Sequence, residues 1–250
     1  MLDFVVGDKS LPDELLYGRV GYLYALLFVN KYTKEGAVSG NVIRKVVEAI
    51  LRSGIQLSKK RKELNVPLVY EWHDKNYLGA AHGVAGILYL LLRARCAVTV
   101  SELHSLIKPT IDWLINFRYS SGNFFSSVGS ESDRLVQWCH GAPGFVHLLT
   151  LASQVFKDQS YMNIALECGD AVWNRGLLTK GYSICHGVSG NAYTFLHLYQ
   201  ITGSDIHLYR AACFADWCTK YPKHQGLQPD RPFSLFEGNY VYYILQPLER

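Results

Sequence analysis

The stretches Trp138-Cys139-His140-Gly141 and Cys185-His186-Gly187 each place a cysteine and a histidine directly before a glycine and an apolar run. Two thiolates and one imidazole form a ligand set that zinc favours, and three protein ligands leave a fourth position open for chemistry. We therefore take Cys139, Cys185 and His186 as candidate metal ligands. The alternative, from spacing alone, is that the two cysteines are buried and pack as small hydrophobic side chains.

Both stretches belong to a glycine pattern that is repeated along the chain. A Gly-x-x-Gly pair precedes an apolar run four times, and a fifth copy at Gly238 has valine in place of the second glycine. The copies are 46 to 65 residues apart, which is close to the period of helical-hairpin arrays. The four full pairs are Gly18–Gly21, Gly83–Gly86, Gly141–Gly144 and Gly187–Gly190. Cys139 and Cys185 occupy similar positions in neighbouring repeats, so we expect the fold to bring them together.

Two kinds of helix are predicted, and they alternate along the chain. The runs after the glycine pairs, such as Tyr22–Phe28, are apolar nearly all round, which is typical of buried helices. Segments at 42–57, 160–175 and 204–220 have one apolar face and one polar face. The alternation predicts an all-α fold in which an inner layer of helices carries all the glycine turns at one end. We expect residues 1–250 to form a single domain.

The composition is typical of a compact protein with a large core. Apolar residues make up 49% of the chain and charged residues 18%, against about 25% charged in an average soluble protein. The net charge is only +4, and the single basic run at 59–62 predicts no nucleic-acid partner. No apolar run reaches the roughly 18 residues of a membrane span, and the N-terminus does not resemble a signal peptide. With six scattered cysteines, reduced thiols and a cytoplasmic location are expected, with the nucleus or the periphery of the plasma membrane as further locations.

Five motifs together resemble one known family. They are His82–Gly86, Trp138–Gly144, Cys185–Asn191, Asp13–Gly21 and Pro232–Gly238. The first three resemble motifs of the lanthionine synthetase C-like (LanC-like) proteins, and the last two look like the eukaryotic branch of that family. The resemblance covers nearly the whole chain and implies an α/α toroid of seven helical hairpins around a zinc site. About five of the seven hairpins are present here, which predicts an incomplete toroid, shortened at its N-terminal side and altered after Gly238.

The resemblance also implies catalytic roles for two histidines. His82 matches a histidine with an acid/base role in the bacterial cyclases, and an imidazole pKa of about 6.5 suits that task. His140 lies beside a candidate ligand and is the second candidate for proton transfer. The alternatives are that His82 is a satisfied core histidine and that His140 only orients its neighbour. Glu14 has better spacing than Asp13 to match an acidic residue of the cyclase site, or it is a carboxylate favoured by a helix N-terminus.

Substrate binding is predicted at a lysine and a loop. Lys180 matches a lysine that contacts glutathione in the eukaryotic branch, and its cation would hold a substrate carboxylate or stabilise a thiolate; the alternative is a solvated lysine. The family's other glutathione contacts lie in the loop that reads Leu227–Arg231 here. Leu227 replaces the arginine that is usual at its start. Asp230 and Arg231 remain candidate substrate-binding residues.

These resemblances predict zinc as the cofactor and glutathione as a partner, with peptides or proteins as further substrates. Zinc would favour the thiolate form of a bound thiol, which would add to an electrophilic alkene such as a dehydroamino acid. His82 or His140 would then supply a proton. The product would be a thioether, as expected of a glutathione transferase-like enzyme. The alternative is a non-catalytic adaptor that binds glutathione or a peptide around a structural zinc.

Overall fold

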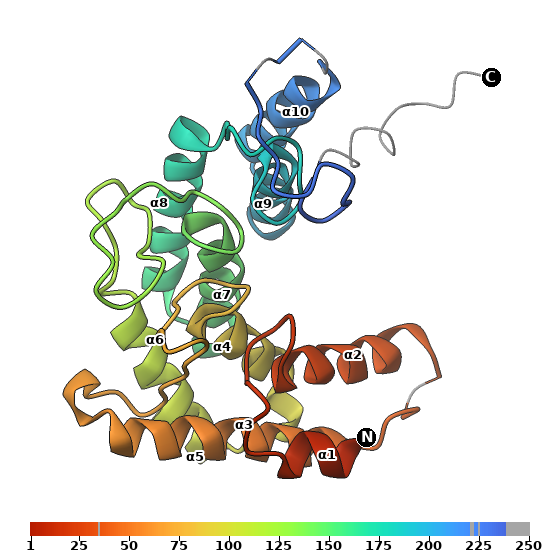
Figure 1. Cartoon of the computed structure of the whole chain (residues 1–250), viewed down its shortest axis with the longest axis vertical. Helices are drawn as coiled ribbons and strands as arrows, with labels where there is room; N and C mark the ends of the chain where they lie inside the picture. The colour runs from red at the N-terminus through yellow and green to blue at the C-terminus, as the bar shows by residue number, and fades with distance from the viewer. Residues whose placement is uncertain (35, 221–222, 225, 239–250) are drawn as a thin grey trace. The chain divides into compact units, whose positions relative to one another are not determined.

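The computed structural model describes residues 1–34, 36–220, 223–224 and 226–238. In these residues the secondary structure is helical, and no β-strand occurs beyond three isolated bridges, which confirms the all-α prediction (Figure 1). None of the helices in this part of the chain is both long and apolar enough to cross a membrane. The helices are α1 (Leu2–Gly7), α2 (Arg19–Tyr32), α3 (Gly40–Lys60), η1 (Lys62–Leu64), α4 (Val84–Arg93), η2 (Arg95–Ala97), α5 (Val100–Glu102), η3 (Leu103–Ile107), α6 (Lys108–Leu114), α7 (Ala142–Phe156), α8 (Gln159–Arg175), α9 (Val188–Thr202) and α10 (Asp205–Thr219).

The chain divides into two compact units, and each is described by itself. Unit 1 comprises Met1–Phe117 and Ser126–Ser130, and unit 2 comprises Arg118–Phe125 and Glu131–Arg250. The long segment between α6 and α7 therefore contributes to both units. The single domain expected over residues 1–250 stays a prediction.

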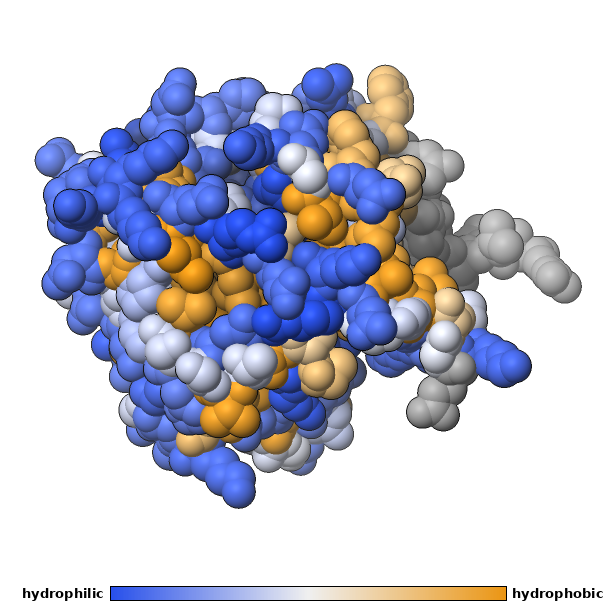
Figure 2. Space-filling view, turned by 90° about the horizontal axis from the view of Figure 1, so that it is seen from below, coloured by the Kyte–Doolittle hydropathy of each residue, from blue (hydrophilic) through white to orange (hydrophobic). Residues whose placement is uncertain are grey.

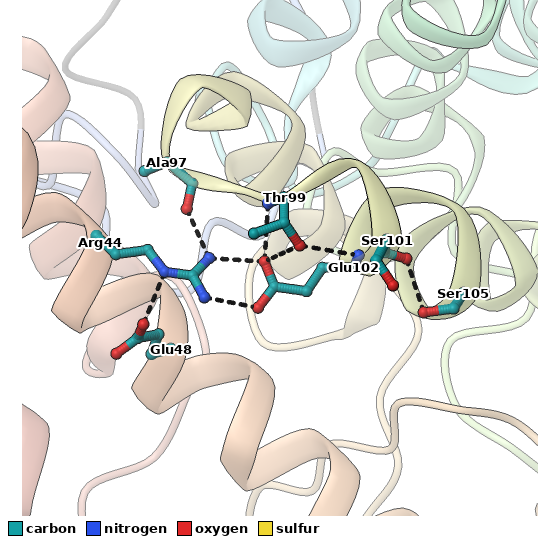
Figure 3. A network of polar contacts seen from close by, with 7 residues as sticks. All are labelled: Arg44, Glu48, Ala97, Thr99, Ser101, Glu102 and Ser105. Carbon is teal, nitrogen blue, oxygen red and sulfur yellow. Dashed lines mark hydrogen bonds and ion pairs between the residues drawn. The ribbon is translucent and has the colours of Figure 1, made fainter.

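Unit 1 is built on the amphipathic helix α3, which packs against α1 and α2. The helix begins after Ser39, whose hydroxyl accepts a hydrogen bond from the N–H of Asn41 at 3.3 Å and so caps its N-terminus. On its polar side, Arg44 donates hydrogen bonds to Glu48 and to both carboxylate oxygens of Glu102. Figure 3 shows this network, which links α3 to the short helix α5.

The helices that follow the glycine turns differ in burial. α4 and α7 are buried along most of their lengths, as the sequence predicts. α2 buries Leu23 but leaves Tyr24, Phe28 and Tyr32 about half exposed. These three residues are four positions apart and form one aromatic stripe, with successive ring centroids 6.0 and 4.6 Å apart. The structure thus corrects the expectation that Tyr22–Phe28 is buried all round, because the described residues of unit 1 leave this side of α2 uncovered. Figure 2 shows hydrophobic patches between hydrophilic side chains on one face of the molecule.

Unit 2 contains two helix pairs. α7 packs against α8 and α9 packs against α10, while α7 also contacts α9 (Figure 1). α8 begins after Asp158, whose carboxylate accepts a hydrogen bond from the N–H of Ser160 at 3.0 Å. The fifth glycine turn also belongs to this unit: a Cβ atom at Gly238 would stand 1.9 Å from the carbonyl oxygen of Arg231. The apolar run that follows this glycine lies outside the described residues.

Candidate metal centre

The turn before α7 carries Cys139 and requires a glycine. Gly141 has a φ of 117°, and a Cβ atom there would stand 2.1 Å from the carbonyl oxygen of Leu135. Both facts exclude an ordinary L side chain at this position. The side-chain oxygen of Asn123 accepts a hydrogen bond from the N–H of Ala142 at 2.7 Å, which satisfies one of the free N–H groups at the start of α7. The close approach of the backbone at Gly141 and the hydrogen bond from Ala142 to Asn123 therefore both fix the turn that carries Cys139.

Cys185 lies in the corresponding turn before α9, and backbone hydrogen bonds join the two turns. The N–H of Cys139 donates to the carbonyl oxygen of Cys185 at 3.3 Å. The N–H of Cys185 donates in turn to the carbonyl oxygen of Phe236 at 2.9 Å. The Phe236 ring also meets the Trp138 ring edge-on, with 5.8 Å between centroids. Three segments that are far apart in the sequence thus meet at the two cysteines.

The structure brings the three candidate ligands together in what we call the Cys/His cluster: Cys139, Cys185 and His186. Their potential ligand atoms all lie within 4.8 Å of one another, and all three residues are buried. Across the described part of the chain, this is the one place where three cysteine, histidine or acidic side chains meet so closely. The Cys139 thiol also donates to the side-chain oxygen of Gln137 at 3.5 Å.

The pKa values in the cluster move in opposite directions. The hydrogen bond between the two thiols, with the charge of Cys185 and burial, raises the pKa of Cys139 far above its usual range. The same hydrogen bond, together with the neighbouring His186, lowers the pKa of Cys185 to about 6. The Cys185 sulfur in turn raises the pKa of the His186 imidazole, against the effect of burial. The arrangement therefore favours a thiolate at Cys185 near neutral pH.

The Cys/His cluster fits a zinc ion by the chemistry of its donors. Two sulfur atoms and one imidazole nitrogen match the soft ligands of zinc sites, and one coordination position would remain open. A divalent cation would also stabilise both cysteines as thiolates, which the buried thiol pair cannot achieve alone. Cys139, Cys185 and His186 would be the residues that hold it.

Lys180 and Asp230 form an ion pair next to the cluster. The Lys180 ammonium donates to Oδ1 of Asp230, while Oδ2 of the same carboxylate lies 3.3 Å from Nε2 of His186. The Lys180 cation lowers the pKa of Asp230. The loop that carries Asp230 is attached to the preceding segment by a hydrogen bond from the Gln228 N–H to the carbonyl oxygen of Thr179 at 2.8 Å. Arg231, the next residue, is exposed.

His82 lies in unit 1, where its partner is the carboxylate of Glu14. The distance from Nδ1 of His82 to Oε2 of Glu14 is 2.7 Å, and the Glu14 side chain is only 2% exposed. The N–H groups of Leu16 and Tyr17 donate to the same carboxylate. The Trp72 ring stacks on the His82 ring, with 3.9 Å between centroids and 12° between planes. A buried carboxylate and an indole ring thus fix the orientation of this imidazole.

His140 is partly buried and follows Cys139 in the same turn, where its carbonyl oxygen accepts a hydrogen bond from the Gln137 N–H at 3.0 Å. The catalytic roles of His82 and His140 stay predictions, as does substrate binding by Lys180, Asp230 and Arg231. Sequence reasoning missed Asn123 and Trp72, because each makes its contact from an irregular segment, whose conformation has no periodic signal in the sequence. Trp72 lies in the long segment between η1 and α4, and Asn123 in the one between α6 and α7; their position in these segments was the available signal.

Comparison with known sequences gives the family. The family model described as lanthionine synthetase C-like protein matches residues 3–249. The Danio rerio protein named glutathione S-transferase LANCL1 is 46% identical over 248 residues, which are 98% of this chain and 61% of that protein. The Arabidopsis thaliana LanC-like protein GCL1 is 37% identical over 238 residues, which are 93% of this chain and 54% of that protein. The chain therefore spans less than two thirds of the length of these relatives.

Comparison with solved structures gives the fold. The structure resembles that of nisin cyclase with a TM-score of 0.71 and 17% sequence identity, over 93% of this chain and 62% of that one. This likeness confirms the predicted α/α toroid fold class. Because the family model matches nearly the whole chain, the protein belongs to the lanthionine synthetase C-like family.

Proposed function

We propose that this protein binds zinc through Cys139, Cys185 and His186 and adds the thiol of glutathione to dehydroamino acids in peptides or proteins. The observation that carries the proposal is the convergence of two thiols and an imidazole within 4.8 Å at buried positions. The name of the Danio rerio relative, a glutathione S-transferase, supports a glutathione-dependent reaction.

In the proposed reaction, the S–H bond of the thiol adds across a carbon–carbon double bond. Zinc, when bound, supplies the positive charge that favours the thiolate form of the substrate thiol near neutral pH. The sulfur forms a bond to the β carbon of the dehydroamino acid, and the α carbon takes up a proton. No oxidant or reductant is consumed.

The protein's own residues have two tasks in this reaction. The Lys180 ammonium would bind a carboxylate of glutathione and so position its thiol. His140 or His82 would donate the proton to the α carbon. For His82, the Glu14 carboxylate at 2.7 Å from Nδ1 fixes the orientation of the ring and leaves Nε2 as the nitrogen that would carry the proton.

Two measurements on the purified chain test the proposal in sequence. Elemental analysis should find about one zinc per chain, and Cys185→Ala should lose it. The matched control is Cys168→Ala, because Cys168 is also buried but lies on α8 outside the cluster. A dehydroalanine peptide incubated with glutathione should then gain the mass of one glutathione. A wild-type chain that is folded but free of zinc would contradict the proposal.

A second candidate function is a non-catalytic adaptor that binds glutathione or a peptide around a structural zinc. Leu227 stands where the resemblance places an arginine that contacts glutathione, which favours weaker substrate binding. Zinc and glutathione binding without formation of a thioether would select this function. A cytoplasmic location accompanies both candidates, because all six cysteines lie among the described residues and are free thiols, as in reducing compartments.

A further inference from the structure

We infer that Asp230 is a built-in occupant of the substrate-carboxylate position on Lys180, and that its release from Lys180 strengthens its hold on the metal ligand His186. This inference rests on the proposed function, since it concerns the same zinc and glutathione sites. It assigns to Asp230 a positioning role that couples the two sites.

The carboxylate of Asp230 is shared between two cationic or donor groups. Oδ1 pairs with the Lys180 ammonium, and Oδ2 lies 3.3 Å from Nε2 of His186. A substrate carboxylate that binds Lys180 carries the same charge as Asp230 and would be repelled by it, so we expect the two carboxylates to compete for the ammonium. The pair is half exposed, at 41% for Lys180 and 49% for Asp230, so an incoming anion can reach it.

The contact with His186 is close but incompletely formed. Nε2 of His186 is buried, and no described residue, Asp230 included, makes an aligned hydrogen bond with it. A buried donor without an aligned partner costs free energy. While Oδ1 is paired with Lys180, Oδ2 does not align with Nε2 of His186. Release from Lys180 would allow Asp230 to turn toward His186 and remove this cost.

The orientation of His186 determines whether a ligand on Lys180 tightens or weakens zinc binding. Nε2 of His186 lies 3.3 Å from Oδ2 of Asp230, so we take Nδ1 as the nitrogen that would bind the metal together with the two thiols. A carboxylate that accepts a hydrogen bond from the distal nitrogen of a ligating histidine orients the ring and makes it a better ligand. A carboxylate ligand on Lys180 should therefore tighten zinc binding, and by thermodynamic reciprocity zinc should tighten binding of that ligand.

The loop around Asp230 supports a movement of its side chain without a movement of the backbone. The Gln228 N–H donates to the carbonyl oxygen of Thr179 on one side of Asp230. On the other side, the carbonyl oxygen of Phe236 accepts from the N–H of Cys185. Both attachments are to the segment that carries Lys180 and His186. Rotation of the side chain is thus enough to exchange one partner for the other.

The decisive experiment measures the zinc dissociation constant by competition with a chelator, with and without S-methylglutathione. This probe keeps the carboxylates of glutathione but has no thiol that could itself bind zinc. In the wild type, saturating S-methylglutathione should tighten zinc binding about two- to fivefold, the range of an exposed ion pair. Asp230→Asn should weaken zinc binding about tenfold, as loss of a partner to a ligating histidine does, and should abolish the effect of the probe.

Three further variants keep the test specific. Asp216→Asn removes the acid of another exposed lysine–aspartate pair of unit 2, Lys220–Asp216, and should leave zinc binding and its coupling to the probe unchanged. In metal-free protein, calorimetry should show that Asp230→Ala binds S-methylglutathione about two- to fivefold more tightly than the wild type. Lys180→Gln should abolish that binding.

The outcomes separate this inference from the proposed function. If the wild type binds zinc but Asp230→Asn binds it equally well and keeps the coupling, the inference is wrong and the proposed zinc site stands. If the wild type binds no zinc, the proposed function fails. In that case the metal-free arm still tests whether Asp230 competes for Lys180, and unchanged or weaker binding by Asp230→Ala would overturn that part too.

Discussion

The two compact units each carry a histidine next to a glycine turn, but the side chains that contact the two histidines differ. Gly83 and Gly187 have the same φ of −116° and nearly the same ψ. In unit 1, His82 meets a buried carboxylate that also accepts two backbone N–H groups. In unit 2, His186 meets two thiols. The comparison teaches that the repeated turn sets only the position of the two histidines, and that the side chains around each histidine determine whether the site could hold an ion.

Removal of the proposed zinc should therefore affect unit 2 alone, and this is the largest effect we expect. At a zinc concentration a thousandfold above the dissociation constant, binding stabilises the folded state by about 4 kcal/mol. Hydrogen exchange after chelation should show faster exchange in α7 and α9, with no change in α3. Cys185→Ala should remove the response to zinc, while Cys168→Ala should keep it. Equal loss of protection in both units would contradict the comparison.

The complementary change in unit 1 removes the Glu14 carboxylate, which contacts His82 and two backbone N–H groups. Glu14→Ala would leave two N–H groups and the His82 ring without their acceptor, which should cost about 3 kcal/mol, the upper value for hydrogen bonds to a charged group. Glu14→Gln keeps one oxygen acceptor and should cost less. The loss of stability is measured by chemical denaturation, monitored through the protection of α3 against hydrogen exchange. The zinc dissociation constant of both variants should equal that of the wild type. A zinc affinity that falls with Glu14→Ala would show that the two clusters depend on each other.

The third expected effect is that unit 2 loses stability at a higher pH than unit 1 when the solution is acidified. Burial, and then the neighbouring His197, lower the pKa of His147 on α7 to about 3, below the unfolded value of about 6.5. Between these values the unfolded chain binds a proton that the folded chain excludes, so stability is complete above pH 6.5 and falls as the pH drops. The loss from pH 6.5 to pH 5 should be about 2 kcal/mol, at about 1.4 kcal/mol per pH unit.

The measurement is the protection of α7 and α9 against hydrogen exchange as a function of pH in metal-free protein. His147→Phe removes the titrating group, keeps a ring of similar size, and should flatten the profile in this pH range. The ring of His147 lies 4.4 Å from that of His197, so a residual slope should remain from the second histidine, whose pKa burial also lowers. An unchanged slope in His147→Phe would refute the assignment.

Much of the fold could be predicted because glycine spacing reports backbone geometry directly. A Cβ atom at Gly187 would stand 2.2 Å from the backbone nitrogen of Ser183, so the turn itself demands the residue that marks it in the sequence. The exposure of Tyr24 and Phe28 on α2 could not be predicted in this way. An apolar run shows that a helix can be buried on every side, but not which neighbours are present to cover it.

The candidate site shows the same limit. Cys139, Cys185 and His186 could be placed together because they stand at similar positions in repeats of one fold. The partners that orient the chemistry could not be placed, since Asn123 reaches the turn before α7 from a loop and Asp230 reaches His186 from another. Hydrogen bonds of this kind depend on loop conformations, which carry no periodic signal in the sequence.

The smallest expected effect concerns the ion pair that joins α3 to α5 in unit 1 (Figure 3). The Arg44 guanidinium lowers the pKa of Glu102 to about 2, below the usual value of about 4.3 for an unfolded chain. Stability from this pair is therefore present above about pH 4.3 and is lost as the pH falls toward 2. Both side chains are partly solvated, so the contribution should be only about 1 kcal/mol.

Glu102→Gln should lower the free energy of unfolding by about that amount at pH 7 and have no effect near pH 2. The control is Glu63→Gln, because Glu63 lies 3.4 Å from Arg61 in a more exposed pair and should contribute much less. Denaturant unfolding of the two variants at both pH values gives the comparison. Unit 1 would then lose stability on acidification only below pH 4.3, whereas unit 2 begins to lose it near pH 6.5. At pH 5, protection against hydrogen exchange should therefore fall in α7 while it persists in α3. A loss of protection in α3 at pH 5 would mean that the two units unfold together. The different partners of His82 and His186 would then not give the two units separate responses to acid.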